Sequence, residues 1–530
     1  MKRCSKDQHG EACIATQNAV QPLKRRVMWS AIAMWMIACG AITEHRPVEL
    51  GPAPQRPLPR QVHYTLTLPP ALMAATVRVC FEGPAPSQLV AGVAQPRAQL
   101  KHAQLRPPHP KRVHNADPIA HGRALQVRDR SISLRGVPSD ACIEYQITLP
   151  DARHITLPES RVYATSEWLY RPPADERTGM VFELEVELPA NVDASLPFPT
   201  LAPHRYVIPT SAFLYLSQGV FGHFDVEEFE LSGCLVAVVF PQDFPQRARQ
   251  AVLMQLKRAL PAVATVTGTF PRKTLRVVVA PVAESSPSGS AIVFGQVTRG
   301  GGGSVLLLVR RDATRESMAN DWTCIHELSH LLLPFVERED AWLSEGFSTY
   351  YQEVLRGRSG LSSHQLTWSR ILNGTQRTMR TSTPLAQQSA RMYERHNYPD
   401  VYWGGAAYAL AVDVALRQQG QSLDAVLKKL DAARLDRHPP QSATELLSKL
   451  DRLSGTAIFR DTAEQLVYGP ADKAAQAHAA LLFNLGLIAC DGARTDDCDP
   501  QSARLVLAAS QPEHSLRDAI LNHPAGTQPR

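Results

Sequence analysis

Two histidines and a glutamate form the pattern in this chain of 530 residues that is best suited to chemistry. The segment HELSH places His326 and His330 four positions apart, with Glu327 directly after the first histidine. Side chains four apart lie on one face of a helix, so the two imidazoles could bind one metal ion. Glu327 would lie one position round the helix, where its carboxylate could take a proton from a water held by the metal. The pattern therefore predicts a zinc-dependent hydrolase of the peptidase type.

A third ligand has to come from elsewhere in the chain. The continuation x-x-G-x-x-H of the metzincin peptidases is absent, because Leu333 and Val336 occupy the glycine and histidine positions. A glutamate on a following helix fits instead, and Glu345 in AWLSEGFSTYYQ is the best candidate, since an unpaired carboxylate would be costly to bury in so apolar a segment. The nearer acidic residues lie in the polar connector VERED, where we expect solvated side chains: Glu337, Glu339 and Asp340.

HELSH followed by WLSEGFSTYY resembles the gluzincin aminopeptidases, the family of membrane alanyl aminopeptidase and leukotriene A4 hydrolase, and is similar to the bacterial glycyl aminopeptidases. The resemblance implies one Zn²⁺ per chain, bound by His326, His330 and Glu345. It also implies that Glu327 is the general base, and that Tyr402, which opens YWGGA, stabilises the tetrahedral intermediate of peptide hydrolysis. The fold that it implies is a thermolysin-like catalytic domain, and the expected substrate is a peptide or protein.

The family pattern differs from this chain upstream of HELSH. The family carries G-x-M-E-N, whose glutamate binds the free amine of the substrate, whereas the matching segment here is RGGGGS, residues 299–304, without a carboxylate. An aminopeptidase, an endopeptidase or processing protease of the same fold, and a non-catalytic surface binding module all stay open. Gly301, Gly302 and Gly303 could let an extended substrate pair with the strand edge SVLLL, or could form a flexible turn.

The elements that would position these residues change in character along the chain. Strand patterns dominate residues 61–230, as in the alternating MVFELEVEL. Residues 231–470 combine buried strand patterns with helical ones, and residues 471–530 form a helical tail. We expect an α+β multidomain protein: a β-rich N-terminal domain, then a catalytic domain with a helical C-terminal part. The catalytic domain should contain strands at 234–240, 275–282 and 304–311 and helices at 244–266, 318–333, 341–357, 363–373, 404–419, 422–434, 442–454 and 457–468.

The first 40 residues indicate export. The basic cluster at 24–26 precedes the apolar run VMWSAIAMWMIA and then Cys39, the order found in secretion signals. The run is short for a membrane span, and the residues before Cys39 resemble a bacterial lipobox. We therefore expect a periplasmic or cell-envelope protein associated with the membrane through this segment, either lipid-anchored at Cys39 or held by an uncleaved anchor, with a proline-rich linker at 41–60.

Charge and cysteine content narrow the function further. The formal net charge is only +6, from 56 basic and 50 acidic residues, so nucleic-acid binding is not indicated. Six cysteines follow the signal, and in an oxidising compartment Cys80 could pair with Cys142, and Cys490 with Cys498. The absence of C-x-x-C argues against a thiolate zinc site. Nothing in the sequence indicates an oligomeric state.

Overall fold

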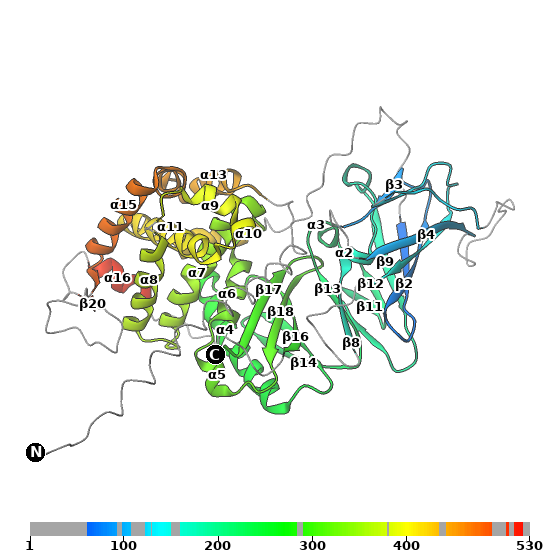
Figure 1. The fold of residues 1–530 in the computed structure, drawn as a ribbon, viewed down its shortest axis with the longest axis horizontal. Coiled ribbons are helices and arrows are strands. Elements are labelled where there is room, and N and C mark those ends of the chain that lie inside the picture. Colours follow the sequence, from blue (N-terminus) through cyan, green and yellow to red (C-terminus); the bar gives the residue numbers. More distant parts are fainter. Residues whose placement is uncertain are drawn as a thin grey trace, which may run out of the picture.

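The computed structural model describes residues 61–92, 98–107, 122–128, 130–149, 160–282, 290–378, 381–433, 441–489, 505–507 and 514–522. The expected secretion signal with Cys39, the linker 41–60, and the pair Cys490 and Cys498 lie outside these ranges. Within them, no helix is both long and apolar enough to cross a membrane. Three parts follow one another along the longest axis of the molecule: a region of strands, a mixed sheet with helices, and a helical region (Figure 1).

The N-terminal region is built from strands with mostly antiparallel pairing. Buried and partly exposed residues alternate along its first strand, so that one face of the sheet covers a core. Its largest sheet contains, in spatial order, β11 (Thr200–Ala202), β12 (Arg205–Val207), β9 (Val181–Glu187), β1 (Gln61–Thr67), β2 (Ala74–Phe81), β7 (Cys142–Thr148) and β4 (Gln99–Arg106). Two smaller sheets contain β10 (Asp193–Ser195), β13 (Gln218–Gly222) and β8 (Ser160–Ala164), and β3 (Gln88–Val90), β6 (Ser131–Ser133) and β5 (Val127–Arg128).

A disulfide joins two neighbouring strands of this region. Cys80 in β2 and Cys142 in β7 lie opposite each other in the antiparallel register and are bonded to each other. The expected pairing is therefore confirmed. The other two described cysteines, Cys234 and Cys324, are free and buried.

A five-stranded mixed sheet forms the centre of the molecule. Its spatial order is β14 (Phe224–Leu231), β15 (Cys234–Pro241), β16 (Thr274–Val282), β18 (Gly303–Arg310) and β17 (Ile292–Thr298). The three inner strands are parallel and almost entirely buried, as their continuous apolar sequences predict. The two edge strands are antiparallel to their neighbours and escaped the sequence analysis. β14 carries mostly exposed, charged side chains, so it shows no core pattern, and it begins the sheet seven residues before the expected boundary at residue 231.

The helices largely follow the expected order, with two differences at the site. The helix expected at 318–333 is divided, because Asp321 accepts hydrogen bonds from the backbone N–H groups of Thr323 and Ile292 and a new helix starts there. The helix expected at 404–419 begins six residues earlier, at Tyr398, with Pro399 in its first turn. Short helices in the N-terminal region are α2 (Thr165–Trp168), η2 (Ala174–Glu176) and α3 (Ser211–Leu214).

The remaining elements pack on one another beyond the sheet and form the helical part of the core. They are α4 (Gln246–Thr267), α5 (Arg315–Ala319), α6 (Thr323–Ser329), η3 (His330–Leu332), η4 (Arg338–Asp340), α7 (Ala341–Arg358), α8 (His364–Thr378), α9 (Leu385–Ala390), α10 (Met392–Arg395), α11 (Tyr398–Gln418), α12 (Leu423–Ala432), α13 (Ala443–Ser454), α14 (Ile458–Ala463), η6 (Glu464–Tyr468), α15 (Ala471–Asn484), β19 (Leu487–Ala489), β20 (Leu505–Leu507) and α16 (His514–Leu521).

Helices α7 and α11 approach each other backbone to backbone. A Cβ atom added to Gly346 would lie 2.3 Å from the backbone of Gly405, and one added to Gly405 would lie 1.9 Å from the carbonyl oxygen of Trp342. Only glycine allows this approach. Because Glu345 precedes one of these glycines and Tyr402 lies three residues before the other, the close contact brings both side chains to the same region. The chain is thus an α+β multidomain protein, as expected.

Candidate metal centre

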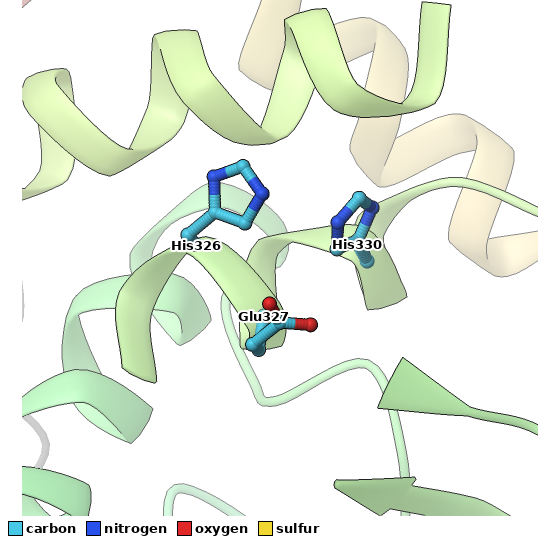
Figure 2. Close-up of side chains that lie close together, drawn as sticks. All are labelled: His326, Glu327 and His330. Atoms are coloured by element: carbon cyan, nitrogen blue, oxygen red, sulfur yellow. The ribbon is translucent and has the colours of Figure 1, made fainter. Parts of the chain in front are cut away.

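The two histidines project from the end of α6 and the start of η3 into the protein interior. Their exposed fractions are 2% for His326 and 9% for His330, and their ring centroids are 5.0 Å apart. Figure 2 shows the two imidazole rings above α6 and the carboxylate of Glu327 below them. These three residues offer ligand atoms that all lie within 4.8 Å of one another. The helical spacing of HELSH therefore produces the expected grouping.

Glu345 reaches both histidines from α7. Its Oε2 atom lies 3.3 Å from Nε2 of His326 and 3.4 Å from Nε2 of His330. Tetrahedral zinc with bonds of about 2.0–2.2 Å holds its donor atoms about 3.4 Å apart. The two nitrogens and the oxygen thus have the chemical types and separations that a zinc ion requires, and the donor set fits a metal.

The short connector between the two ligand helices is long enough because it folds as one turn, η4. Val336 forms a bridge with Gln441, and the N–H of Glu337 donates to the carbonyl of Gln441. Glu337 and Glu339 are exposed, as expected for this segment. Asp340 differs, since its carboxylate accepts a hydrogen bond from the N–H of Ala443 at the start of α13.

Second contacts orient both imidazoles. Nδ1 of His326 lies 3.1 Å from Oε1 of Gln352, and Nδ1 of His330 lies 3.1 Å from Oγ of Ser344. An amide oxygen can only accept, so Nδ1 of His326 donates and its Nε2 keeps a lone pair for a metal. The sequence analysis missed Gln352. Its position two helical turns after Glu345, on the same face of α7, was the available signal.

Charge in the site is balanced between the acids and the histidines. Burial by itself would raise the pKa of Glu345, but His330 and His326 hold it well below its usual range. Burial by itself would lower the pKa of His326, but a hydrogen bond with Glu345 and the charges of Glu327 and Glu345 raise it. The site therefore keeps an ionised carboxylate where a cation would bind.

Glu327 lies against the edge strand β17. The N–H of Val297 donates to its Oε2 at 3.0 Å, and a Cβ atom added to Gly295 would lie 2.4 Å from its Cγ. Burial raises the pKa of Glu327, and the charges of His330 and His326 oppose this. The sequence analysis missed β17, because IVFGQVT is short and interrupted by glycine and glutamine.

Tyr402 comes from the second turn of α11 and stacks on His326, with ring centroids 5.7 Å apart and an interplanar angle of 12°. Burial, followed by the Glu345 carboxylate, raises the pKa of Tyr402 well above its usual value. The phenol therefore stays protonated and can donate a hydrogen bond. The two alternative tyrosines are engaged elsewhere: Tyr408 donates to the carbonyl of Phe459, and Tyr398 lies near His396.

The glycine run has a different role from the substrate contact that we considered. β18, which contains SVLLL, pairs with β16 on one side and β17 on the other, so it has no free edge for a substrate. Gly301 and Gly302 form the turn between β17 and β18, with φ of 98° and 156°, and Gly303 begins β18. A Cβ atom on Gly301 would lie 2.6 Å from the carbonyl oxygen of Pro197. The run therefore makes a tight turn against the N-terminal region.

Arg299, the first residue of the same segment, holds the end of the ligand helix. Its guanidinium donates to the carbonyl oxygens of His330 and Leu333, the second at 3.2 Å, and lies over the ring of Phe335. A cation is favourable at the C-terminal end of a helix. The segment upstream of HELSH thus contributes to the site through this arginine.

Known proteins provide a comparison for the fold. No family model matches the sequence, and no curated protein matches it. Among solved structures, the chain is similar to an aminopeptidase N family protein from Idiomarina loihiensis, with 16% identity, a TM-score of 0.60, and coverage of 83% of this chain and 80% of that one. It is also similar to an M1 zinc metallopeptidase from Deinococcus radiodurans, with 15% identity, a TM-score of 0.49, and coverage of 77% and 94%. The first similarity confirms the gluzincin resemblance at the level of the fold.

Proposed function

We propose that this protein is a zinc-dependent peptidase in which His326, His330 and Glu345 bind one Zn²⁺. The observation that carries the proposal is the convergence of two imidazole nitrogens and one carboxylate oxygen at 3.3 and 3.4 Å, beside Glu327. Bound zinc would supply a Lewis acid that polarises the scissile carbonyl and activates water. The peptidase fold of the Idiomarina loihiensis protein supports the same conclusion.

Two residues of the chain would carry the proton and the charge. Glu327, held by the N–H of Val297, would take a proton from the attacking water and pass it to the leaving amine. Tyr402, whose phenol stays protonated, would donate a hydrogen bond to the carbonyl oxygen as it gains negative charge. One such donor contributes about 2.7–4 kcal/mol to catalysis.

An aminopeptidase is the first candidate activity, because the resemblance and the fold both favour it. An endopeptidase is the second, and one observation favours it: β17, the described strand beside Glu327, contains no carboxylate to bind a substrate amine. Matched peptides with free and acetylated N-termini distinguish the two. A strong preference for the free amine supports an aminopeptidase, and equal cleavage supports an endopeptidase.

The protein would act outside the cytoplasm. The disulfide between Cys80 and Cys142 supports export, because such bonds persist in oxidising compartments. We propose attachment to the cell envelope through the N-terminal segment, by a lipid on Cys39 or by an uncleaved anchor. Mass spectrometry of the mature N-terminus tests this, and an unmodified N-terminus after Cys39 contradicts both forms of attachment.

The central test is a single substitution. Glu327→Gln should keep about one zinc per chain and lower kcat by about 10²–10⁴, because the general base is lost while the ligands stay. Metal analysis and peptide hydrolysis measure the two effects. Glu339→Gln, in the exposed connector, is the matched control and should behave like the wild type. Wild-type hydrolysis by the Glu327→Gln enzyme, or a purified protein unable to bind zinc, would overturn the proposal.

A further inference from the structure

The connector between the two ligand helices carries a cation that the proposed mechanism does not use. The guanidinium of Arg338, in η4, lies 3.8 Å from the ring centroid of Tyr393, in α10. Stacking on an aromatic ring fixes the plane of a guanidinium and leaves its edge available. Both side chains are only partly buried.

Arg338 forms no ion pair and no side-chain hydrogen bond with any residue in the described part of the chain. The acidic residues nearest in sequence do not neutralise it: Asp340 accepts from Ala443, and the side chains of Glu337 and Glu339 are exposed. A guanidinium has five N–H donors, which an anion can approach in pairs. The geometry is therefore that of a pre-oriented anion-binding group with no internal partner.

This cation lies on the Tyr402 side of the metal centre. The ring of Tyr393 packs edge-to-face on Tyr398, with centroids 5.9 Å apart. Tyr398 precedes Tyr402 by one helical turn, a rise of about 6 Å. Tyr393 also contributes to the raised pKa of Tyr402, after burial and Glu345, which places the two phenols near each other. Since an extended peptide advances about 3.3 Å per residue, Arg338 can reach a substrate group two or three residues from the scissile bond.

We propose that Arg338, held in place by Tyr393, is a carboxylate-binding subsite that selects peptides with a negative charge two or three residues from the cleaved bond. The carboxylate is either the C-terminus of a short peptide or an acidic side chain, since both present the same two oxygens to a guanidinium. The inference rests on the proposed peptidase function. It gives charge recognition to a cation in a site whose edge strand β17 has no carboxylate for an amine.

The test measures binding separately from catalysis. Zinc-loaded Glu327→Gln protein is titrated calorimetrically with two peptide pairs, one differing in a C-terminal acid against an amide, the other in an internal Glu against Gln. We expect the charged member of one pair to bind about 10–100-fold more tightly, as is typical of a charge-assisted hydrogen-bond pair. Adding Arg338→Met should abolish this preference without changing zinc content, and Arg338→Lys should keep part of it.

A matched control removes a neighbouring positive charge. Arg395→Met, on exposed α10, should leave the preference intact. Equal binding of charged and neutral peptides, a preference that survives Arg338→Met, or one that is lost equally in Arg395→Met would each overturn the subsite. The pair that shows the preference identifies the terminus or the side chain as the source. Arg338-dependent binding by a wild-type protein that hydrolyses no peptide would support the subsite and overturn the peptidase function.

Discussion

The placement of Glu327 depends on a residue without a side chain. Gly295 lies where β17 passes the carboxylate, and a Cβ atom there would approach Cγ of Glu327 to 2.4 Å and Oε1 to 2.8 Å. The N–H of Val297 then fixes Oε2. The identity of the general base was predictable from HELSH, because it follows from the helical spacing. Its support was not, because β17 comes from a different part of the chain.

Gly295→Ala should therefore impair catalysis through Glu327. The new methyl group displaces the carboxylate, and a shift of about 1 Å can cost about 10²-fold in rate. We expect kcat to fall by about 10–100-fold, with KM and zinc content close to those of the wild type. Steady-state kinetics with metal analysis measure these values. An unchanged kcat would show that Glu327 tolerates the methyl group, and loss of zinc would show a wider disturbance of the site.

At the scale of elements, the metal centre is assembled by helix packing. α6 supplies two ligands and α7 supplies the third, and η4 closes the connector between them. α11 then lies against α7 through the contact between Gly346 and Gly405, which places Tyr402 on the ring of His326. The helical patterns predicted α7 closely. They could not predict the contact between the helices, because two glycines give no periodic signal.

Gly405→Ala should separate α7 from α11. Its Cβ atom would lie 1.9 Å from the carbonyl oxygen of Trp342, a backbone atom that cannot rotate away. We expect a loss of about 1–3 kcal/mol in the free energy of unfolding, measured by urea denaturation, together with reduced kcat. Gly404→Ala is the matched control, since its Cβ atom would meet only the end of the Leu385 side chain. Equal losses in the two variants would contradict the close contact.

At the scale of the whole molecule, the N-terminal region is fastened to the central sheet. Valines from β8 and β13 share a buried cluster with residues of β15, β16 and β18. Arg276 in β16 donates to Oγ and the carbonyl oxygen of Ser195 and to the carbonyl oxygen of Gln218. Burial lowers the pKa of Arg276 to about 9. These contacts make the strand region and the mixed sheet one connected body (Figure 1).

The stability of the molecule should depend on pH through a histidine at its helical end. His478 in α15 is 2% exposed, neither ring nitrogen has a hydrogen-bond partner among the described residues, and burial lowers its pKa from 6.5 to about 4. The folded protein thus keeps His478 neutral while the unfolded chain binds a proton. Its contribution is complete above about pH 6.5 and is lost as the pH falls toward 4, by about 2 kcal/mol at pH 5.

Urea denaturation at pH 7 and pH 5 measures this loss. His478→Leu should remove about 2 kcal/mol of the difference between the two pH values, because the group that gains a proton on unfolding is absent. His364→Leu, at an exposed position, should leave the difference unchanged. An identical pH dependence in the wild type and His478→Leu would contradict the assignment.

The sequence by itself determined the chemistry of the ligands and the order of the elements. His326, His330 and Glu327 could be identified because helical spacing is a local property, and Glu345 because a carboxylate in an apolar segment needs a partner. Only the tertiary structure decided which strand lies beside Glu327, how the glycine run is used, and that Arg338 stacks on Tyr393. These contacts join residues far apart in the chain, and their geometry depends on packing, which no local pattern records.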